Sequence, residues 1–224
     1  MIPPSEAEIY KAIKEAIIDQ RLRPNMQLVE EVIAESFGVS RTPVRNVFRR
    51  LATEKLVSVV PYKGTFVWCP TVSESKEVFE MRRVVEDAAI RRLCRTMDET
   101  QRKQLEQMLK DEMEANGRGD LFGALRISGD FHIRIAQLSG NSYYSKYLEE
   151  LVSLSYVIIA FYGQRRPTHC HHHKDILGAI QSRDEDKAAR LMAVHLKELE
   201  EALDYGEGWE EPGTLADIFK PRLA

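Results

Sequence analysis

The chain has 224 residues, of which 43% are hydrophobic and 30% charged, with only 12 Gly and 9 Pro. This composition is typical of a globular protein and excludes a disordered or fibrous chain, and the length favours two unequal domains. No apolar run approaches the roughly 20 residues of a membrane helix, and the first residues lack the pattern of a signal peptide. We therefore expect a cytoplasmic protein with no membrane segment.

Positive charge is concentrated near the N-terminus. Residues 1–70 carry a net charge of +2, whereas residues 71–224 carry a net charge of −5. Within residues 36–73, six Lys or Arg residues stand against the single acid Glu54. On charge alone, a solvated helix face and a surface for a polyanion explain this stretch equally well.

Hydrophobic spacing predicts three helices in the first part of the chain. The first covers residues 6–20, and the second covers about residues 29–37 and ends at Gly38, a natural left-handed stop. Ser40 is then expected to cap a third helix over residues 41–54 with its side-chain oxygen. The side chains that this third helix is expected to bury are Val44, Val47, Phe48 and Leu51.

The opposite face of the third helix carries a basic stripe formed by Arg41, Arg45 and Arg49 at i, i+4 and i+8. Two β-branched runs follow and flank a tight turn at residues 62–64, which predicts a hairpin. Three helices followed by a hairpin form the layout of a winged helix-turn-helix. Such a helix enters the DNA major groove, where Arg reads guanine, while Lys63 at the hairpin tip would lie beside the backbone or minor groove.

The run LVEEVIAESFGVSRTPVRNVFRRLATEKLVSVVPYKGTFV resembles the DNA-binding domain of GntR-type transcriptional regulators, chiefly through GVSRTPVR and the later glycine of the wing. The resemblance covers roughly residues 5–70. It departs from many members at Asn46, where they have Glu, and we expect this change on the helix surface to leave the fold intact. The resemblance places the following residues at the DNA-contacting positions of the family: Ser40, Arg41, Thr42, Arg45 and Gly64.

Helical periodicity continues nearly to residue 204, in six segments separated by Gly, Asn, Pro or Asp. An antiparallel helical bundle is the simplest packing of these segments. The predicted fold is therefore mainly α, with a winged helix-turn-helix domain over residues 1–70, a helical domain over residues 71–205 and a tail over residues 206–224. We expect apolar side chains of the tail to dock on the body.

Three histidines, His132, His173 and His195, stand on the apolar faces of three different predicted helices. A buried imidazole must form a hydrogen bond or bind a ligand to offset its desolvation. Neutral imidazole is also the commonest transition-metal ligand, and a site of three histidines leaves positions open for water or an anion. The pattern leaves two interpretations open, three separately satisfied core residues or one shared metal site.

The helical part is similar to the ligand-binding domain of the FadR branch of these regulators, often called FCD, through RRVVED, GDFHIRIAQLSGN, HHHKDILGAI and MAVHL. Many members bind a divalent metal through three His and an Asp four residues before the first His. The resemblance maps the three histidines onto His132, His173 and His195, and therefore implies a Zn- or Ni-like ion. The Asp position holds Ser128, so water, Asp130 or the carboxylate of an effector would have to complete the site, if metal binds.

Resemblance also implies that the effector is a small carboxylate. Arg82, four residues before Glu86, is the candidate partner for this anion. Its alternative role is an interhelical salt bridge. We expect Asn141 to cap the following helix rather than to contact a ligand.

A second group of possible metal ligands, residues 169–172 with the sequence His-Cys-His-His, follows Pro167 in an apparent loop. Four adjacent residues cannot all face one ion within a regular helix, so adventitious metal capture is the favoured interpretation. The three cysteines do not form a disulfide framework, and Cys69 and Cys94 lie among apolar neighbours, as core residues do.

The leading hypothesis for function is a dimeric, ligand-responsive DNA-binding regulator that is released from, or recruited to, a palindromic operator by its effector. One alternative is a metal-dependent enzyme that uses the three-His centre, although no carboxylate stands out as its general base. Another is an architectural DNA-binding protein without an effector, which leaves the inward histidines unexplained. No nucleophile motif, phosphate loop or dinucleotide fingerprint is present.

Overall fold

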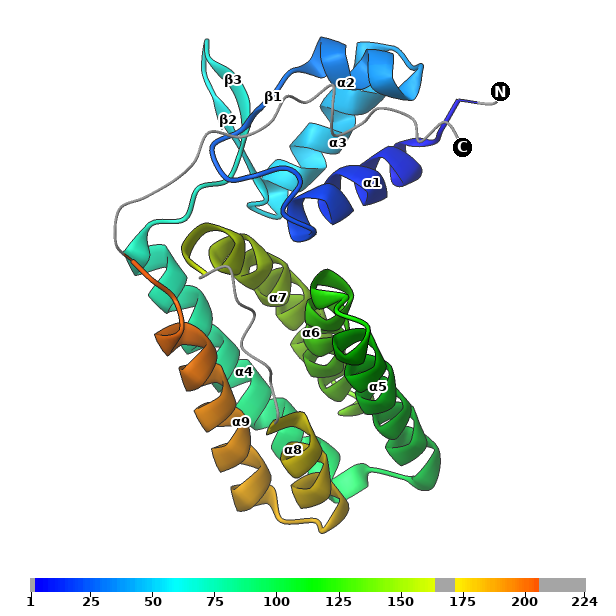
Figure 1. Cartoon of the computed structure of the whole chain (residues 1–224), viewed down its shortest axis with the longest axis vertical. Coiled ribbons are helices and arrows are strands. Elements are labelled where there is room, and N and C mark those ends of the chain that lie inside the picture. Colours follow the sequence, from blue (N-terminus) through cyan, green and yellow to red (C-terminus); the bar gives the residue numbers. More distant parts are fainter. Residues whose placement is uncertain (1–2, 164–171, 206–224) are drawn as a thin grey trace. The chain divides into compact units, whose positions relative to one another are not determined.

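A computed structural model of the chain describes residues 3–163 and 172–205 (Figure 1). The described residues form two compact units. The N-terminal unit contains the chain up to Thr71 together with Tyr156–Phe161, and the helical unit contains Val72–Ser155 and Tyr162–Asp204. Each unit has its own hydrophobic core and is described here separately.

The N-terminal unit has three helices and a small antiparallel sheet of strand order β1-β3-β2. Its elements are α1 (Glu6–Ile18), β1 (Gln27–Leu28), α2 (Glu30–Phe37), α3 (Arg41–Thr53), β2 (Val57–Val60) and β3 (Gly64–Val67). The winged helix-turn-helix prediction is confirmed, and β1 is an additional strand that the sequence pattern does not reveal. The two residues of β1 pair with the wing, which ties the loop between α1 and α2 to the hairpin.

The helix ends of this unit follow the capping rules with one exception. Gly38 ends α2 in the left-handed conformation, with φ of 64°, as predicted. Ser40 occupies the N-cap position of α3 with extended backbone, but its side chain forms no capping hydrogen bond, so the prediction that its oxygen caps the helix is wrong. The exposed hydroxyl group of Ser40 therefore does not contribute a capping hydrogen bond to α3.

The inner face of α3 packs in the core through Val44, Val47, Phe48 and Leu51, all of them predicted. At the C-terminal end of α3, Glu54 accepts hydrogen bonds from Tyr10, at 2.6 and 2.8 Å, and from Lys14, at 3.2 Å. Tyr10 and Lys14 lie on α1, so these contacts link the first helix to the end of the third. This link and the shared core fix which face of α3 is turned outward.

Six helices follow among the described residues, as the periodicity predicts, and they belong to the helical unit except for Tyr156–Phe161 of α7. They are α4 (Val72–Thr96), α5 (Glu99–Gly117), α6 (Leu121–Leu138), α7 (Ser142–Tyr162), α8 (His172–Gln181) and α9 (Glu185–Glu201). Within this unit α4 packs along α9, and α5 packs along α6. The side chain of Asn141 accepts a hydrogen bond from the backbone N–H of Tyr143 at 3.0 Å, which confirms its predicted role at the start of α7.

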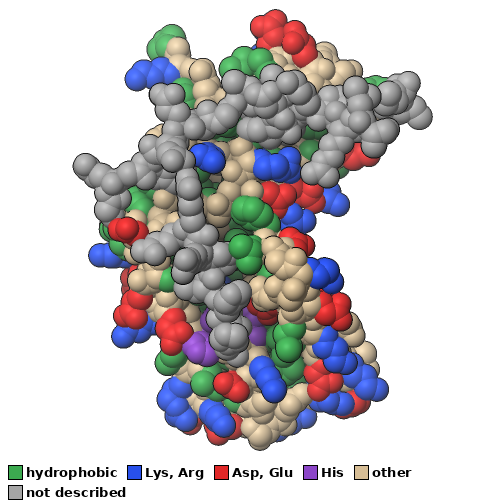
Figure 2. All heavy atoms as spheres, in the orientation of Figure 1, with side chains coloured by type: hydrophobic (Ala, Val, Ile, Leu, Met, Phe, Trp, Pro, Cys, Tyr) green, Lys and Arg blue, Asp and Glu red, His purple; other side chains and the backbone are tan. Residues whose placement is uncertain are grey.

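The core of the helical unit is built from apolar side chains of α4, α5, α6, α8 and α9. Cys94 is buried in this core as predicted, whereas Cys69 is only half-buried and not a full core residue. The surface drawn in Figure 2 has acidic and basic side chains interspersed over the helical unit. None of the helices in the described ranges is long and apolar enough to cross a membrane.

Candidate functional site

The basic stripe of α3 lies on the solvent-exposed face of that helix. Arg41, Arg45 and Arg49 are all exposed, as is Thr42 at the start of the helix. Because the opposite face of α3 is buried in the core, these side chains can reach a partner without any rearrangement of the helix. The structure thus presents the arginines predicted to contact DNA on one accessible surface.

Two of these arginines form ion pairs with the first turn of α2. The Arg45 guanidinium group donates from Nε to Glu30 at 3.1 Å and from Nη2 to the second oxygen of Glu30 at 2.8 Å. Arg41 donates from Nη2 to the neighbouring acid Glu31. The hydrogen bond from Arg45 is the first cause of a lowered pKa at Glu30, so this carboxylate is ionised at neutral pH.

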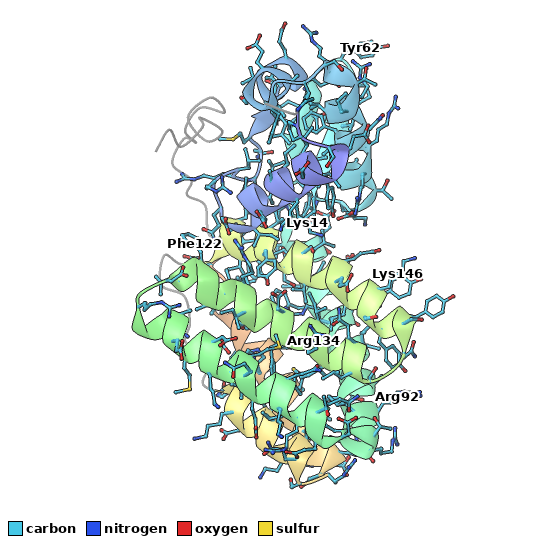
Figure 3. All side chains as sticks on the ribbon, turned by 90° about the vertical axis from the view of Figure 1, so that its right-hand side faces the viewer. Lys14, Tyr62, Arg92, Phe122, Arg134 and Lys146 are labelled. Atoms are coloured by element: carbon cyan, nitrogen blue, oxygen red, sulfur yellow. The ribbon has the colours of Figure 1, made fainter. Side chains whose placement is uncertain are left out.

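The tip of the wing is formed by residues 61–63 between β2 and β3, and Tyr62 projects from it (Figure 3). Lys63 is exposed there. Gly64 has φ of +113°, a conformation open mainly to glycine, and a Cβ atom at this position would lie 3.0 Å from Nε2 of Gln27. The same Nε2 atom donates to the carbonyl oxygen of Lys63 at 2.9 Å. These contacts give Gly64 a conformational role in shaping the wing.

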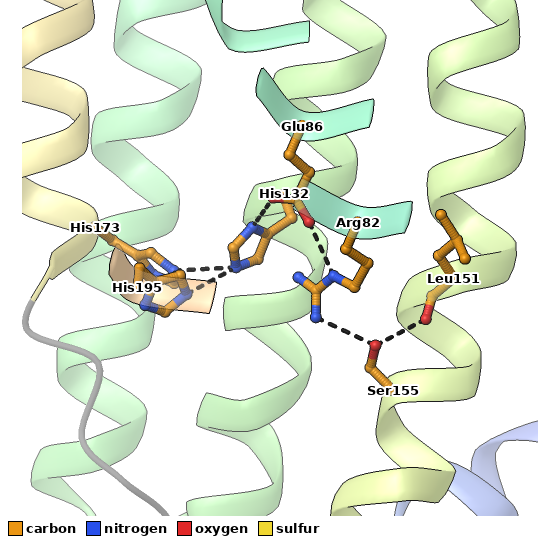
Figure 4. Close-up of polar contacts among 7 residues, drawn as sticks. All are labelled: Arg82, Glu86, His132, Leu151, Ser155, His173 and His195. Atoms are coloured by element: carbon orange, nitrogen blue, oxygen red, sulfur yellow. Dashed lines mark hydrogen bonds and ion pairs between the residues drawn. The ribbon is translucent and has the colours of Figure 1, made fainter. Parts of the chain in front are cut away.

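The three inward histidines converge in the helical unit (Figure 4). His132 from α6, His173 from α8 and His195 from α9 are each about 1% exposed. The Nε2 atom of His132 lies 3.1 Å from that of His195, and the Nε2 atom of His173 lies 3.3 and 3.4 Å from the other two. Among the described residues they form one group with the spacing of metal ligands.

Two buried carboxylates orient the rings of His132 and His173 through contacts with their Nδ1 atoms. Oε2 of Glu86 lies 2.5 Å from Nδ1 of His132, and Oε2 of Glu112 lies 2.9 Å from Nδ1 of His173. A carboxylate acceptor at Nδ1 places the ring proton there, which leaves Nε2 with a free lone pair. Two lone pairs therefore point toward the centre of the cluster.

The electrostatics of the cluster favour neutral rings at His132 and His195 and a charged Glu86. Burial alone would raise the pKa of Glu86, but the attraction of His132 and Arg82 lowers this pKa to about 2. Burial lowers the pKa of His132 to about 4, against the opposing effect of Glu86. Burial and the neighbouring imidazoles also lower the pKa of His195. Neutral rings are the form that binds a metal.

The donor set fits a divalent transition metal. Nitrogen atoms bound at about 2.0–2.1 Å to one tetrahedral ion lie about 3.3–3.4 Å apart, close to the separations found here. Facing lone pairs on His132 and His173 cannot bond to each other, and His195 can donate one proton at most. A cation among the three Nε2 atoms satisfies all of them at once.

The other described residues that the sequence suggests as metal ligands do not belong to the three-histidine group. Ser128 is buried on α6, whereas Asp130 is exposed and does not belong to the ligand group, so the proposal that Asp130 completes the site has no support. His172 begins α8 and lies 3.3 Å from Glu198, outside that group. Residues 169–171 and the apolar residues of the tail lie outside the described residues.

Arg82 is buried beside the histidine cluster, with only 3% of its surface exposed. Its Nε donates to Glu86 at 2.9 Å and its Nη1 donates to Ser155 at 3.2 Å, while Nη2 has no hydrogen-bond partner among the described residues. The ion pair lies within α4, so the alternative of an interhelical salt bridge is wrong. In Figure 4 the nitrogen atom without a dashed line lies on the side of His132.

The sequence interpretation missed the acids that complete both sites. Glu112 occupies a helical core position, seven residues after the fully buried Leu105, and this inward position of an acid is the signal that could have revealed it. Glu86 carries the same signal on α4, because Phe79, Ala89 and Ile90 of that helix are fully buried. No comparable signal marked Glu30, because acids are common in the first turn of a helix.

Comparison with known protein families finds two matches. Residues 5–67 match the family described as bacterial regulatory proteins, gntR family, and residues 77–198 match the FCD domain. The first match contains α3 and the wing, and the second contains all three histidines and both of their carboxylates.

Several relatives are similar to the chain over most of its length. The HTH-type transcriptional repressor RspR of Escherichia coli is 28% identical over 203 residues, which is 89% of each chain. The uncharacterized HTH-type transcriptional regulator YdhC of Bacillus subtilis is 25% identical over 86% of this chain and 88% of its own. Among solved structures, a putative transcriptional regulator GntR from Rhodococcus sp. RHA1 has a TM-score of 0.79 at 24% identity, covering 88% of this chain and 95% of that chain.

Proposed function

The chain belongs to the GntR family of bacterial regulatory proteins and carries an FCD domain, and from this membership we propose that it represses transcription under the control of a small carboxylate effector. The N-terminal unit would read the operator, and the helical unit would bind the effector. The proposal rests on one combination of features in the same chain. An arginine stripe is exposed on α3, and Arg82 is buried beside the histidine cluster with one nitrogen that has no hydrogen-bond partner among the described residues.

Operator reading is assigned to the exposed face of α3 and to the wing. Arg45 donates from a planar guanidinium group, which matches the O6 and N7 acceptors of guanine in the major groove. Arg41, Arg49 and Thr42 lie on the same surface, and the exposed Lys63 would contact phosphate. Ser40, with its hydroxyl group free of a capping role, is available to the DNA backbone. The name of the E. coli relative RspR supports repression.

Effector binding is assigned to Arg82 and the three histidines. An unpaired, buried guanidinium N–H is costly, and a carboxylate is the anion that best satisfies it. His132, His173 and His195 would hold a divalent ion, whose contribution is a positive charge that attracts the effector. Ser128 adds no negative charge where relatives are expected to have Asp, which further favours an anionic ligand.

We further propose that two copies of the chain act together on a palindromic operator. Binding of the effector would favour one arrangement of the helices and so change the separation of the two α3 helices. A coupling free energy of about 1–3 kcal/mol corresponds to about 5–150-fold in operator affinity. DNA as the partner implies a cytoplasmic protein.

Selection of bound fragments from genomic DNA by the purified full-length chain tests this proposal. We expect enrichment of an inverted repeat, and about 5–150-fold weaker binding of that repeat when the matching compound from a panel of mono-, di- and tricarboxylates is added. Arg82→Gln should keep operator binding and lose the response to the carboxylate. No preference for any sequence at moderate ionic strength, with or without the panel, would refute the proposal.

The alternative of a metal-dependent enzyme gains no support. Such an enzyme needs a general base next to metal-bound water. The two buried acids nearest the histidines, Glu86 and Glu112, instead accept hydrogen bonds at the Nδ1 atoms, on the far side of the rings.

A further inference from the structure

We propose that Glu30 is a positioning residue for DNA reading, because it holds the Arg45 guanidinium group side-on and leaves the outer edge of that group free for a base. This inference rests on the proposed function. It adds to that function a residue on α2 that acts through Arg45 and touches no base itself.

The geometry of the pair is bidentate. Both oxygens of Glu30 are used, one by Nε of Arg45 at 3.1 Å and the other by Nη2 at 2.8 Å. A pair of parallel hydrogen bonds fixes the plane of the guanidinium group as well as its position. The Glu30 side chain is 30% exposed, so the carboxylate is itself partly held by its surroundings.

Arg45 keeps enough donors for a base while Glu30 is engaged. A guanidinium group has five N–H bonds, and the side-on pair uses one on Nε and one on Nη2. The second N–H of Nη2 and one N–H of Nη1 point in parallel from the end of the group, and the other N–H of Nη1 points toward the Cδ side. Two of these can donate to O6 and N7 of one guanine, so the ion pair and base reading are compatible.

The ion pair with Glu30 is expected to increase the preference of Arg45 for one base more than it increases the total affinity for DNA. The side chain is 52% exposed, and an unrestrained arginine can turn toward phosphate as easily as toward a base. Fixing the side chain in advance lowers the entropy cost of the base contact. The negative charge of Glu30 also repels phosphate, which weakens binding that depends only on the DNA backbone.

The neighbouring pair provides a matched control. Glu31 lies in the same first turn of α2, carries the same charge and pairs with Arg41, with both side chains more than half exposed. Acids at this place favour any helix through its dipole, and Glu30 and Glu31 share that role. Only Glu30 holds Arg45 by two hydrogen bonds, so an effect specific to Glu30 cannot come from helix stability or net charge alone.

The experiment compares the full-length wild type with Glu30→Gln, Glu31→Gln, Arg45→Ala and the double variant Glu30→Gln with Arg45→Ala. Each is titrated with the repeat selected by the wild type, with the same repeat altered at each guanine in turn, and with random DNA. A thermal melt of every variant checks folding.

For Glu30→Gln we expect the discrimination at one guanine to fall by about 5-fold or more while binding to random DNA becomes tighter, and Glu31→Gln should leave that discrimination within about twofold of wild type. In the Arg45→Ala background, Glu30→Gln should tighten binding to the operator and to random DNA alike and leave the discrimination unchanged, since the positioned group is gone.

Unchanged discrimination in Glu30→Gln, or an equal loss in Glu31→Gln, would overturn the assignment. So would a loss of discrimination that persists without Arg45. Tighter operator binding with full discrimination would also overturn it and would make Glu30 an inhibitory residue instead. Failure of the wild type to select any repeat would count against the proposed function itself, which separates the two outcomes.

Discussion

The carboxylate of Glu86 lies 2.5 Å from Nδ1 of His132, and its other oxygen lies 2.9 Å from Nε of Arg82. One buried acid therefore connects the histidine cluster to the arginine assigned to the effector. We expect a ligand bound at either place to affect the other through this chain of two hydrogen bonds. A bound cation and a bound carboxylate are for this reason expected to strengthen each other.

Replacing the histidines tests the metal site directly. We expect one equivalent of metal per chain in the wild type and none in the double variant His132→Ala with His173→Ala, because one histidine alone cannot hold the ion. Elemental analysis of protein purified without an affinity tag measures this. Metal that remains at one equivalent per chain would place the site elsewhere, with residues 169–172 as the next candidates.

Replacing a carboxylate behind a histidine should weaken the metal without removing it. Glu112→Gln is expected to reduce metal affinity by about 10–100-fold, because His173 loses the acceptor that fixes its proton on Nδ1. A competition titration with a chelator measures the affinity. Glu114→Gln, at an exposed position of the same helix, is the control and should bind metal as the wild type does.

Restoring an acid at Ser128 should make metal binding tighter. Ser128→Asp adds a carboxylate one helical turn before His132, and addition of metal should raise the melting temperature of this variant more than that of the wild type. Without metal the same variant is expected to be less stable, since a buried charge is then unpaired. Equal melting shifts on metal addition in both proteins would show that position 128 does not face the ion.

Two variants of the N-terminal unit should distinguish a residue that reads a base from a residue that contacts the DNA backbone. Arg45→Ala is expected to cost about 1–3 kcal/mol of binding to the selected operator, and more than Lys63→Ala costs. Lys63→Ala should weaken operator and random DNA alike and lower the salt dependence of both. Equal losses on operator and random DNA for Arg45→Ala would contradict base reading by that residue.

The stability of the N-terminal unit should fall in acid through Glu54. Burial raises the pKa of this carboxyl group, but the hydrogen bond from Tyr10 and the charge of Lys14 leave the pKa below its ordinary value. A lowered folded-state pKa means that the stabilisation is present above the unfolded pKa of about 4.3 and is lost as pH falls below it. Glu54→Gln is expected to lose about 1–2 kcal/mol near pH 7 and much less near pH 3, as followed by urea unfolding.

The fold of both units could be predicted from the sequence to a large extent because their helices are strongly amphipathic. The buried face of α3 was predicted residue by residue, and Gly38 marked the end of α2. Strand β1 could not be predicted, because a two-residue strand has no periodicity and exists only through its pairing with β3.

The candidate sites were predicted less completely. Each histidine could be placed on an inward face, but only the packing of α6, α8 and α9 brings the three Nε2 atoms within 3.4 Å. The partners Glu86 and Glu112 lie 46 and 61 residues from their histidines, and Glu30 lies on the helix before that of Arg45. Hydrophobic spacing contains no information on such contacts between helices. The missing capping bond of Ser40 is a local detail of side-chain rotation that composition does not determine.

The pairing of β1 with the wing has a mechanical consequence. Gln27 donates a hydrogen bond to the carbonyl oxygen of Lys63, and β1 pairs with β3, so the hairpin is tied to the loop before α2. We therefore expect the spacing between α3 and the hairpin tip to change little when DNA binds. A duplex whose grooves do not match that spacing must itself bend or change width, at an energy that depends on its base steps. Bases that no side chain touches would then contribute to the choice of operator.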